Sequence, residues 1–159
     1  RSVIQPYVKS TQLFACPSNT GNARRSWGSG APGTDPDNGP GNAEIPRSYS
    51  INGINVNIGG TAPSEDNGNS QSLAAIPATA QTILVAETDP GWPWPEAFMA
   101  GTPTEFRDNM FAGHLGTVNF LFVDGHVKAL KPTATGTPVN MWNIEENNDG
   151  DANLMARLR

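Results

Sequence analysis

The amino-acid sequence predicts an α+β fold, in which a small antiparallel sheet with long ordered loops packs on a helix. Residues 118–131 hold two short apolar runs joined by Asp124-Gly125, the turn chemistry of a β-hairpin. Residues 83–86 form a continuous apolar run, which is typical of a strand covered on both faces. The 17 glycines and 14 prolines, roughly a fifth of the chain, favour long loops between few strands.

The remaining elements follow in chain order. Residues 1–15 carry an apolar stripe at helical spacing and are expected to be the end of a helix or an extended arm. Residues 48–54 indicate a short strand, and residues 73–76 one helical turn that the following proline ends. The stretches between them, residues 17–46 and 59–72, are polar loops rich in the residues that favour turns.

The hairpin and a strand over residues 82–88 are expected to make up most of the sheet. With a two-residue type I′ loop, Phe122 stands opposite Val127 and Phe120 stands opposite Ala129. One face of the hairpin is then wholly apolar, so we expect that face to lie on the core.

Bulk composition limits the classes of function. The 159 residues fit a single domain, residues 1–159, and a hydrophobic content of 36% predicts a small core. With 10 Lys and Arg against 15 Asp and Glu, the net charge of −5 argues against a nucleic-acid partner and against a helix lying on a membrane surface. The sequence holds no apolar run of about 18 residues and shows no signal peptide at Arg1.

One motif and two further segments carry a family resemblance. His114 stands ten positions before Asp124-Gly125, and this run resembles the H-X9-DG signature of bacterial prepilin-type, pseudopilin-like proteins. Residues 5–18, which contain the sequences PYVK and LFACPS, are similar to the segment that follows the pilin helix in that family. Residues 82–87, TILVAE, are similar to its central strand.

The resemblance implies a pilin-like domain with a non-enzymatic, structural role. Such a protein is a subunit of a type IV pilin-like filament or of a type II secretion pseudopilus, and it self-assembles through a hydrophobic N-terminal helix. That helix would be mostly missing from this chain, ending near Arg1. The resemblance further implies processing by a prepilin peptidase, insertion in the inner membrane, and an exported domain in the periplasmic or extracellular space.

An acidic cluster near the C-terminus is a candidate calcium site. Hard cations prefer carboxylate and amide oxygens, which Glu145, Asn147, Asp149 and Asp151 supply within seven residues. The resemblance supports this site, since major pseudopilins hold calcium in a loop of their C-terminal region. An EF-hand is excluded, because alanine and leucine stand where its glycine and glutamate are required. Asp35 and Asp37 form a weaker site of the same kind. A solvated acidic loop is the alternative.

The sequence has two histidines and one cysteine. We expect Cys16 to be buried rather than reactive, because it lies between an apolar pair and a proline. His114 and His126 are expected to bind backbone groups. A catalytic or transition-metal role for His114 would need a second nitrogen or a carboxylate nearby, and Glu87, Asp108 and Asp124 are the candidate partners.

Two other functions stay open. A small hydrolase would use His114 as general base, oriented by Asp124 or Glu87, with Ser48, Ser50 or Cys16 as nucleophile, although no known catalytic motif is present. A secreted carbohydrate-binding module would use Trp92 and Trp94, whose rings could stack on sugars. Anchoring of the loops in the core is the alternative role of these tryptophans.

Overall fold

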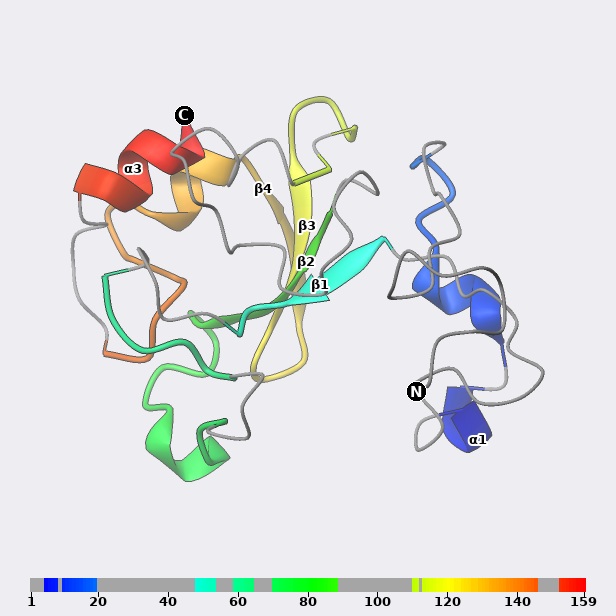
Figure 1. Cartoon of the computed structure of the whole chain (residues 1–159), viewed down its shortest axis with the longest axis horizontal. Helices are drawn as coiled ribbons and strands as arrows, with labels where there is room; N and C mark the ends of the chain where they lie inside the picture. The colour runs from blue at the N-terminus through cyan, green and yellow to red at the C-terminus, as the bar shows by residue number, and fades with distance from the viewer. Residues whose placement is uncertain are drawn as a thin grey trace, which may run out of the picture.

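The computed structural model describes residues 5–8, 10–19, 48–53, 59–64, 70–88, 110–111, 113–145 and 152–159. Their centre is a four-stranded antiparallel sheet in the order β1-β2-β3-β4 (Figure 1). The strands are β1 (Tyr49–Ile51), β2 (Ile83–Glu87), β3 (Val118–Phe122) and β4 (Val127–Leu130). The helical elements are α1 (Gln5–Val8), η1 (Thr11–Phe14), η3 (Leu73–Ala75), η4 (Pro132–Thr135) and α3 (Ala152–Leu158).

The predicted antiparallel sheet is confirmed. β2 falls within the predicted strand and is buried at both ends, with half-buried residues between them. In β3 the buried side chains alternate with half-buried ones, as the period of a strand requires. The short strand β1 and the helical turn η3 also lie inside the ranges that the sequence indicates.

The turn of the hairpin differs from the prediction. The N–H of Gly125 donates to the carbonyl of Phe122 at 2.9 Å, and the N–H of Phe122 donates to the carbonyl of His126 at 2.9 Å. The loop therefore has three residues, 123–125, and ends on Gly125 with φ of 94°. This is the hairpin connection in which a left-handed glycine follows the turn, rather than the two-residue type I′ loop.

The longer loop shifts the register of the hairpin by one residue. Leu121 pairs with Val127, and Phe120 pairs with Lys128, so the predicted pairing of Phe120 with Ala129 is wrong. Opposed residues share a face of the sheet, and the face that carries Phe120 is therefore not wholly apolar on β4. Val127 instead lies on the other face, where it is 63% exposed.

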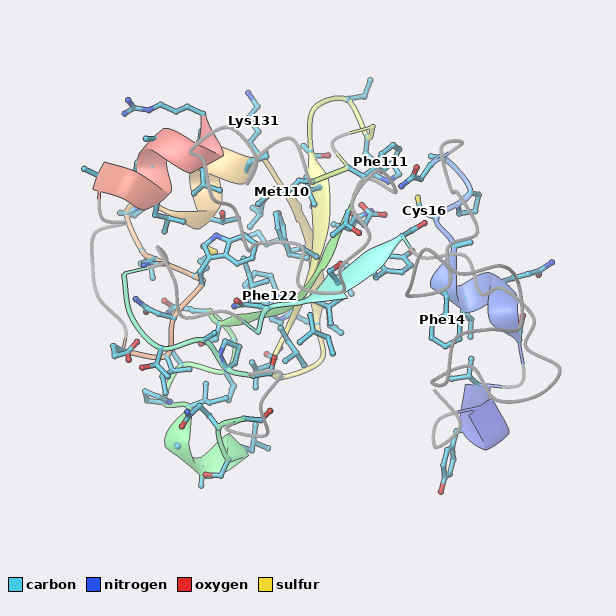
Figure 2. The ribbon with its side chains drawn as sticks, in the orientation of Figure 1. Phe14, Cys16, Met110, Phe111, Phe122 and Lys131 are labelled. Atoms are coloured by element: carbon cyan, nitrogen blue, oxygen red, sulfur yellow. The ribbon has the colours of Figure 1, made fainter. Side chains whose placement is uncertain are left out.

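The core occupies one side of the sheet. Phe120, Phe122 and Val118 point into it, together with Ile83 from β2. Trp142 fills its centre, with its ring edge-on to that of Phe120 at 5.8 Å between centroids. Figure 1 shows α3 and η4 on this side, with the N-terminal segment on the other. In Figure 2, Phe122 and Met110 lie within the packed side and Phe14 and Cys16 lie opposite. 

A C-terminal helix that the sequence analysis did not predict covers this core. Leu154 and Leu158 of α3 are both buried and stand four positions apart, so they share one face of the helix. At the N-terminus, where the sequence indicates the end of a helix or an extended arm, the described residues form the four-residue helix α1 and the 3-10 turn η1. Among the described residues, no helix has the length and apolar character needed to cross a membrane.

The opposite face of the sheet carries an apolar row across all four strands. Ile51 pairs with Val85, and Val85 pairs with Leu121. Leu121 in turn pairs with Val127. Ile51 is 52% and Val127 63% exposed, while Val85 and Leu121 are half-buried. We call these four residues the apolar row.

Candidate functional site

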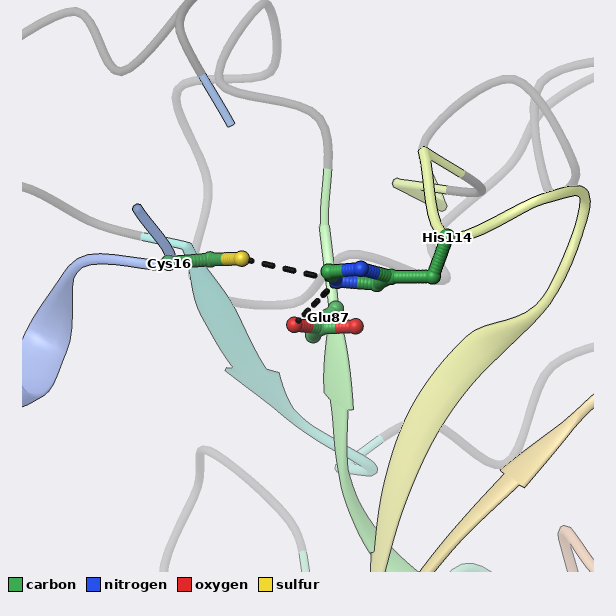
Figure 3. A group of neighbouring side chains, drawn as sticks. All are labelled: Cys16, Glu87 and His114. Atoms are coloured by element: carbon green, nitrogen blue, oxygen red, sulfur yellow. Dashed lines mark hydrogen bonds and ion pairs between the residues drawn. The ribbon is translucent and has the colours of Figure 1, made fainter. Parts of the chain in front are cut away.

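Three side chains from distant parts of the chain meet on the face that carries the apolar row. Figure 3 shows Cys16, Glu87 and His114 converging, the first from the N-terminal segment, the second from β2 and the third from the loop before β3. The Sγ of Cys16 lies 3.5 Å from Nε2 of His114, and the same Nε2 lies 3.2 Å from Oε1 of Glu87. All three donor atoms lie within 4.8 Å of one another. We call these three residues the thiol–carboxylate cluster.

Glu87 is the most deeply buried member of the cluster. It ends β2, and its side chain is 2% exposed. Taking a carboxylate out of water is costly unless hydrogen bonds replace the lost solvent. Oε2 accepts the backbone N–H of Asn119 at 2.9 Å, and Oε1 meets His114. The carboxylate is therefore held on both oxygens.

A tight turn positions His114. The bridge between His114 and Thr117 encloses Leu115 and Gly116, with φ of 58° and 80°. Positive φ at both central residues is the backbone of a type I′ turn. Thr117 closes it by donating from its N–H and its hydroxyl to the carbonyl of His114, at 3.1 and 2.6 Å. Phe111 packs edge-on to the imidazole, with ring centroids 5.5 Å apart.

Backbone contacts to Ser48 fix the position of Cys16. The N–H of Cys16 donates to Oγ of Ser48 at 2.8 Å, and the N–H of Ser48 donates to the carbonyl of Phe14 at 3.0 Å. Asn19 adds a bond from its side-chain amide to the carbonyl of Thr88 at 3.0 Å. Cys16 is 4% exposed, so its predicted burial is confirmed.

The cluster differs from a catalytic triad in one geometric respect. In a nucleophile–histidine–carboxylate triad, the two partners use opposite nitrogens of the imidazole, so that the carboxylate orients the ring while the other nitrogen takes the proton. Here Cys16 and Glu87 both approach Nε2 of His114. Because both partners share one nitrogen, this geometry does not suit a proton relay through the ring, whereas three donor atoms within 4.8 Å of one another can hold a shared cation.

The cluster also acts on a neighbouring tyrosine. Tyr49 stands opposite Glu87 in the register of β1 and β2. Burial raises the pKa of the Tyr49 hydroxyl, and electrostatic interaction with the neighbouring Glu87 and Cys16 side chains raises that pKa further. The neutral phenol is thus favoured beside the cluster.

The two ends of the H-X9-DG motif have different structural roles. His114 precedes β3 and belongs to the cluster, whereas Asp124 and Gly125 form the turn that follows β3. The Asp124 carboxylate accepts from the N–H and Nδ1 of His126 at 3.1 and 2.7 Å. Glu87, not Asp124, is therefore the carboxylate that meets His114.

The other predicted site residues are placed only in part. Both carboxylate oxygens of Glu145 accept the N–H of Thr61 at 2.9 Å. Ser48 binds Cys16 as described, and the hydroxyl of Ser50 donates to that of Thr88 at 3.4 Å. The remaining candidates lie outside the described residues: Asn147, Asp149, Asp151, Asp35, Asp37, Asp108, Trp92 and Trp94. Calcium binding and sugar stacking stay predictions.

Each member of the cluster is a candidate residue in the sequence, but the sequence does not predict that the three form one site. Glu87 was a candidate partner of His114, and Cys16 was expected to be buried. Their positions in the three segments that carry the family resemblance were the signal that could have joined them. Comparisons with protein-family models, with curated proteins and with solved structures found no match to this chain.

Proposed function

We propose that this chain is the globular domain of a pilin-like or pseudopilin-like structural subunit. The subunit is exported after processing by a prepilin peptidase and assembles with copies of itself through an N-terminal hydrophobic helix. The apolar row is the observation that carries the proposal. A sheet is stable when each apolar face packs on a second layer, and in the described part of the chain Ile51 and Val127 at the two ends of this row stay more than half exposed.

The placement of the row supports a helix as that partner. A row of four apolar residues that crosses the strands offers a continuous strip on which a helix can lie. The N-terminal segment with α1 lies on the same side of the sheet (Figure 1). A helix that leads into α1 is therefore connected to the side on which it would pack.

The sequence resemblance supports the same function. The segments at residues 5–18, 82–87 and 114–125 each contribute one element to a single region: the N-terminal segment, β2, and the turn that precedes β3. The resemblance of three separated segments to the pilin-like family is then explained, because the three segments meet in one region of the structure.

Assembly in cells tests the proposal. The chain, expressed with its native upstream sequence in a host that has a prepilin peptidase and a pilin assembly machine, is expected to enter filaments that can be sheared off and collected. Val127→Glu places a charge in the apolar row and should abolish incorporation. Lys128→Ala lowers the net charge by the same amount on the other face of β4 and should not.

Two results would contradict the proposal. One is an upstream sequence that encodes a cleavable secretory signal in place of a basic leader and an apolar run of about 20 residues. The other is equal incorporation of Val127→Glu and Lys128→Ala, with both variants folded by circular dichroism.

A further inference from the structure

Two of the three separations between the donor atoms of the thiol–carboxylate cluster are close to those in a metal coordination shell, and the third pair of atoms lies within 4.8 Å. Zinc lies about 2.3 Å from a thiolate sulfur and about 2.0–2.2 Å from imidazole nitrogen or carboxylate oxygen. At the tetrahedral angle these bond lengths place neighbouring ligand atoms roughly 3.3–3.6 Å apart. The observed separations are 3.5 Å from Cys16 Sγ to His114 Nε2 and 3.2 Å from that nitrogen to Glu87 Oε1. We infer that Cys16, Glu87 and His114 bind a zinc ion, independently of the proposed structural function.

The chemistry of the three donors selects the ion. Calcium and magnesium bind oxygen ligands almost exclusively, so a site in which two of three donors are sulfur and nitrogen disfavours them. Thiolate, imidazole and carboxylate together are ligands of zinc. When Zn²⁺ binds, the thiol of Cys16 releases its proton to solvent and the sulfur bonds to the metal. The thiolate and the Glu87 carboxylate then balance the two positive charges of the ion.

Outer contacts hold two of the ligands in place before any ion arrives. Metal ligands are commonly oriented by a second layer of hydrogen bonds, which contributes about 10–100-fold to metal affinity. The N–H of Asn119 binds the Glu87 oxygen that does not face His114. Ser48 binds the backbone N–H of Cys16 and so fixes the sulfur near the imidazole.

The strained turn beside His114 fits the same interpretation. Leu115 adopts a left-handed φ of 58°, which is unusual for a bulky side chain, and that side chain is fully exposed. Strained backbone persists where the surroundings require it, and it concentrates at functional sites. The turn positions the imidazole in the cluster, where the side chain of His114 is 29% exposed. An ion can therefore reach the cluster from the side of the imidazole.

Cobalt substitution tests the inference directly. Chelator-treated protein, residues 1–159, is titrated with Co²⁺ and the absorption spectrum is recorded. We expect one equivalent to produce a thiolate-to-cobalt charge-transfer band, together with visible bands of a tetrahedral site, and one equivalent of Zn²⁺ to remove them. Zinc affinity, measured by competition with a chromophoric chelator, should fall as the pH is lowered, because the ligands must lose their protons.

Variants separate this site from other binding. Cys16→Ser should remove the charge-transfer band, and His114→Ala and Glu87→Gln should each weaken zinc binding at least 10-fold. His126→Ala and Glu145→Gln remove the same functional groups elsewhere and should leave the affinity unchanged. The inference is wrong if the unaltered protein gives no charge-transfer band at stoichiometric cobalt, a result that does not depend on the folding of any variant. It is also wrong if folded Cys16→Ser and His114→Ala variants bind zinc as tightly as the original chain.

Discussion

The imidazole of His126 lies flat against the phenyl ring of Phe122, with ring centroids 4.3 Å apart and planes 5° from parallel. This contact exists because the three-residue loop sets His126 opposite Phe122. The imidazole covers the end of the core at the hairpin turn, where Phe122 is 2% exposed.

We expect His126→Ala to lower the free energy of unfolding by about 0.5–1.5 kcal/mol, because the stacked ring is lost and Phe122 becomes accessible to water. Urea denaturation measures this change. Lys128→Ala, two residues further along the chain in β4, should stay within about 0.5 kcal/mol of the original protein. Equal effects of the two substitutions would show that the stack contributes nothing.

The turn also predicts a dependence on acid. The pKa of Asp124 lies below its ordinary value, first because its carboxylate accepts the backbone N–H of His126 and then because it binds the His126 side chain. A lowered pKa in the folded state means that the charged form stabilises the fold. That stabilisation is present above the pKa of the unfolded chain, near 3.8, and is lost as the pH falls through the lower folded value.

NMR titration of the Asp124 carboxyl carbon checks this prediction. The midpoint should lie below the ordinary range in the original protein and should rise only partly in His126→Ala, because the backbone bond remains. A complete return to the ordinary value in that variant would assign the whole effect to the imidazole. The free energy of unfolding of Asp124→Asn should not show the decrease that protonation of Asp124 causes in the original protein at acidic pH.

The turn that carries His114 predicts opposite effects at adjacent positions. Asparagine tolerates the left-handed region better than leucine, and Leu115 is fully exposed, so Leu115→Asn should stabilise the protein by about 0.5–1 kcal/mol. Gly116→Ala should destabilise it by about 1 kcal/mol. A methyl group at Gly116 meets no atom within 4 Å, which leaves φ of 80° as the cause. Urea denaturation of both variants is the measurement; a neutral Gly116→Ala would contradict the assigned turn.

Asn52 joins the sheet to the segment that holds Trp142. Its buried amide donates to the carbonyls of Ile83 and Trp142 at 2.8 and 2.9 Å. Asn52→Ala leaves both carbonyls without this donor, and we expect a loss of about 2–4 kcal/mol of unfolding free energy. Asn119→Ala is the control. Asn119 is half-buried and binds Glu87 through its backbone N–H, which alanine keeps, so this substitution should lower the free energy of unfolding by less than about 1 kcal/mol. Equal losses in thermal or urea melts would contradict this role of Asn52.

Local patterns were sufficient to predict the strands but not the register of the hairpin. In β3 the apolar residues Val118, Phe120 and Phe122 alternate because every second side chain is buried, and in β2 the apolar run over 83–86 reflects burial of most of the strand. Both patterns are visible in the spacing of apolar residues along the chain. Asp124-Gly125, in contrast, suits a two-residue loop and also a three-residue loop that ends on glycine. One residue of difference between these loops decides which side chains face the core.

The helix α3 and the cluster depend on contacts that sequence spacing records weakly. In the sequence of α3 the apolar pattern that indicates a helix is the four-residue interval between Leu154 and Leu158. A single interval is too short a pattern to predict a helix from periodicity. Cys16, Glu87 and His114 are separated by long stretches of chain, and their meeting depends on how the N-terminal segment packs beside the sheet. Glu87 could be proposed as a partner of His114, but the approach of both other side chains to one nitrogen could not.

Ser48 connects three parts of the chain through its own backbone and hydroxyl. Its N–H reaches the carbonyl of Phe14, its hydroxyl holds Cys16, and its carbonyl accepts the N–H of Thr88 at 2.8 Å. The N-terminal segment is thereby secured to the rest of the domain by noncovalent bonds of its own. Ser48→Ala consequently removes the side-chain link to Cys16 and keeps the two backbone links, to Phe14 and to Thr88.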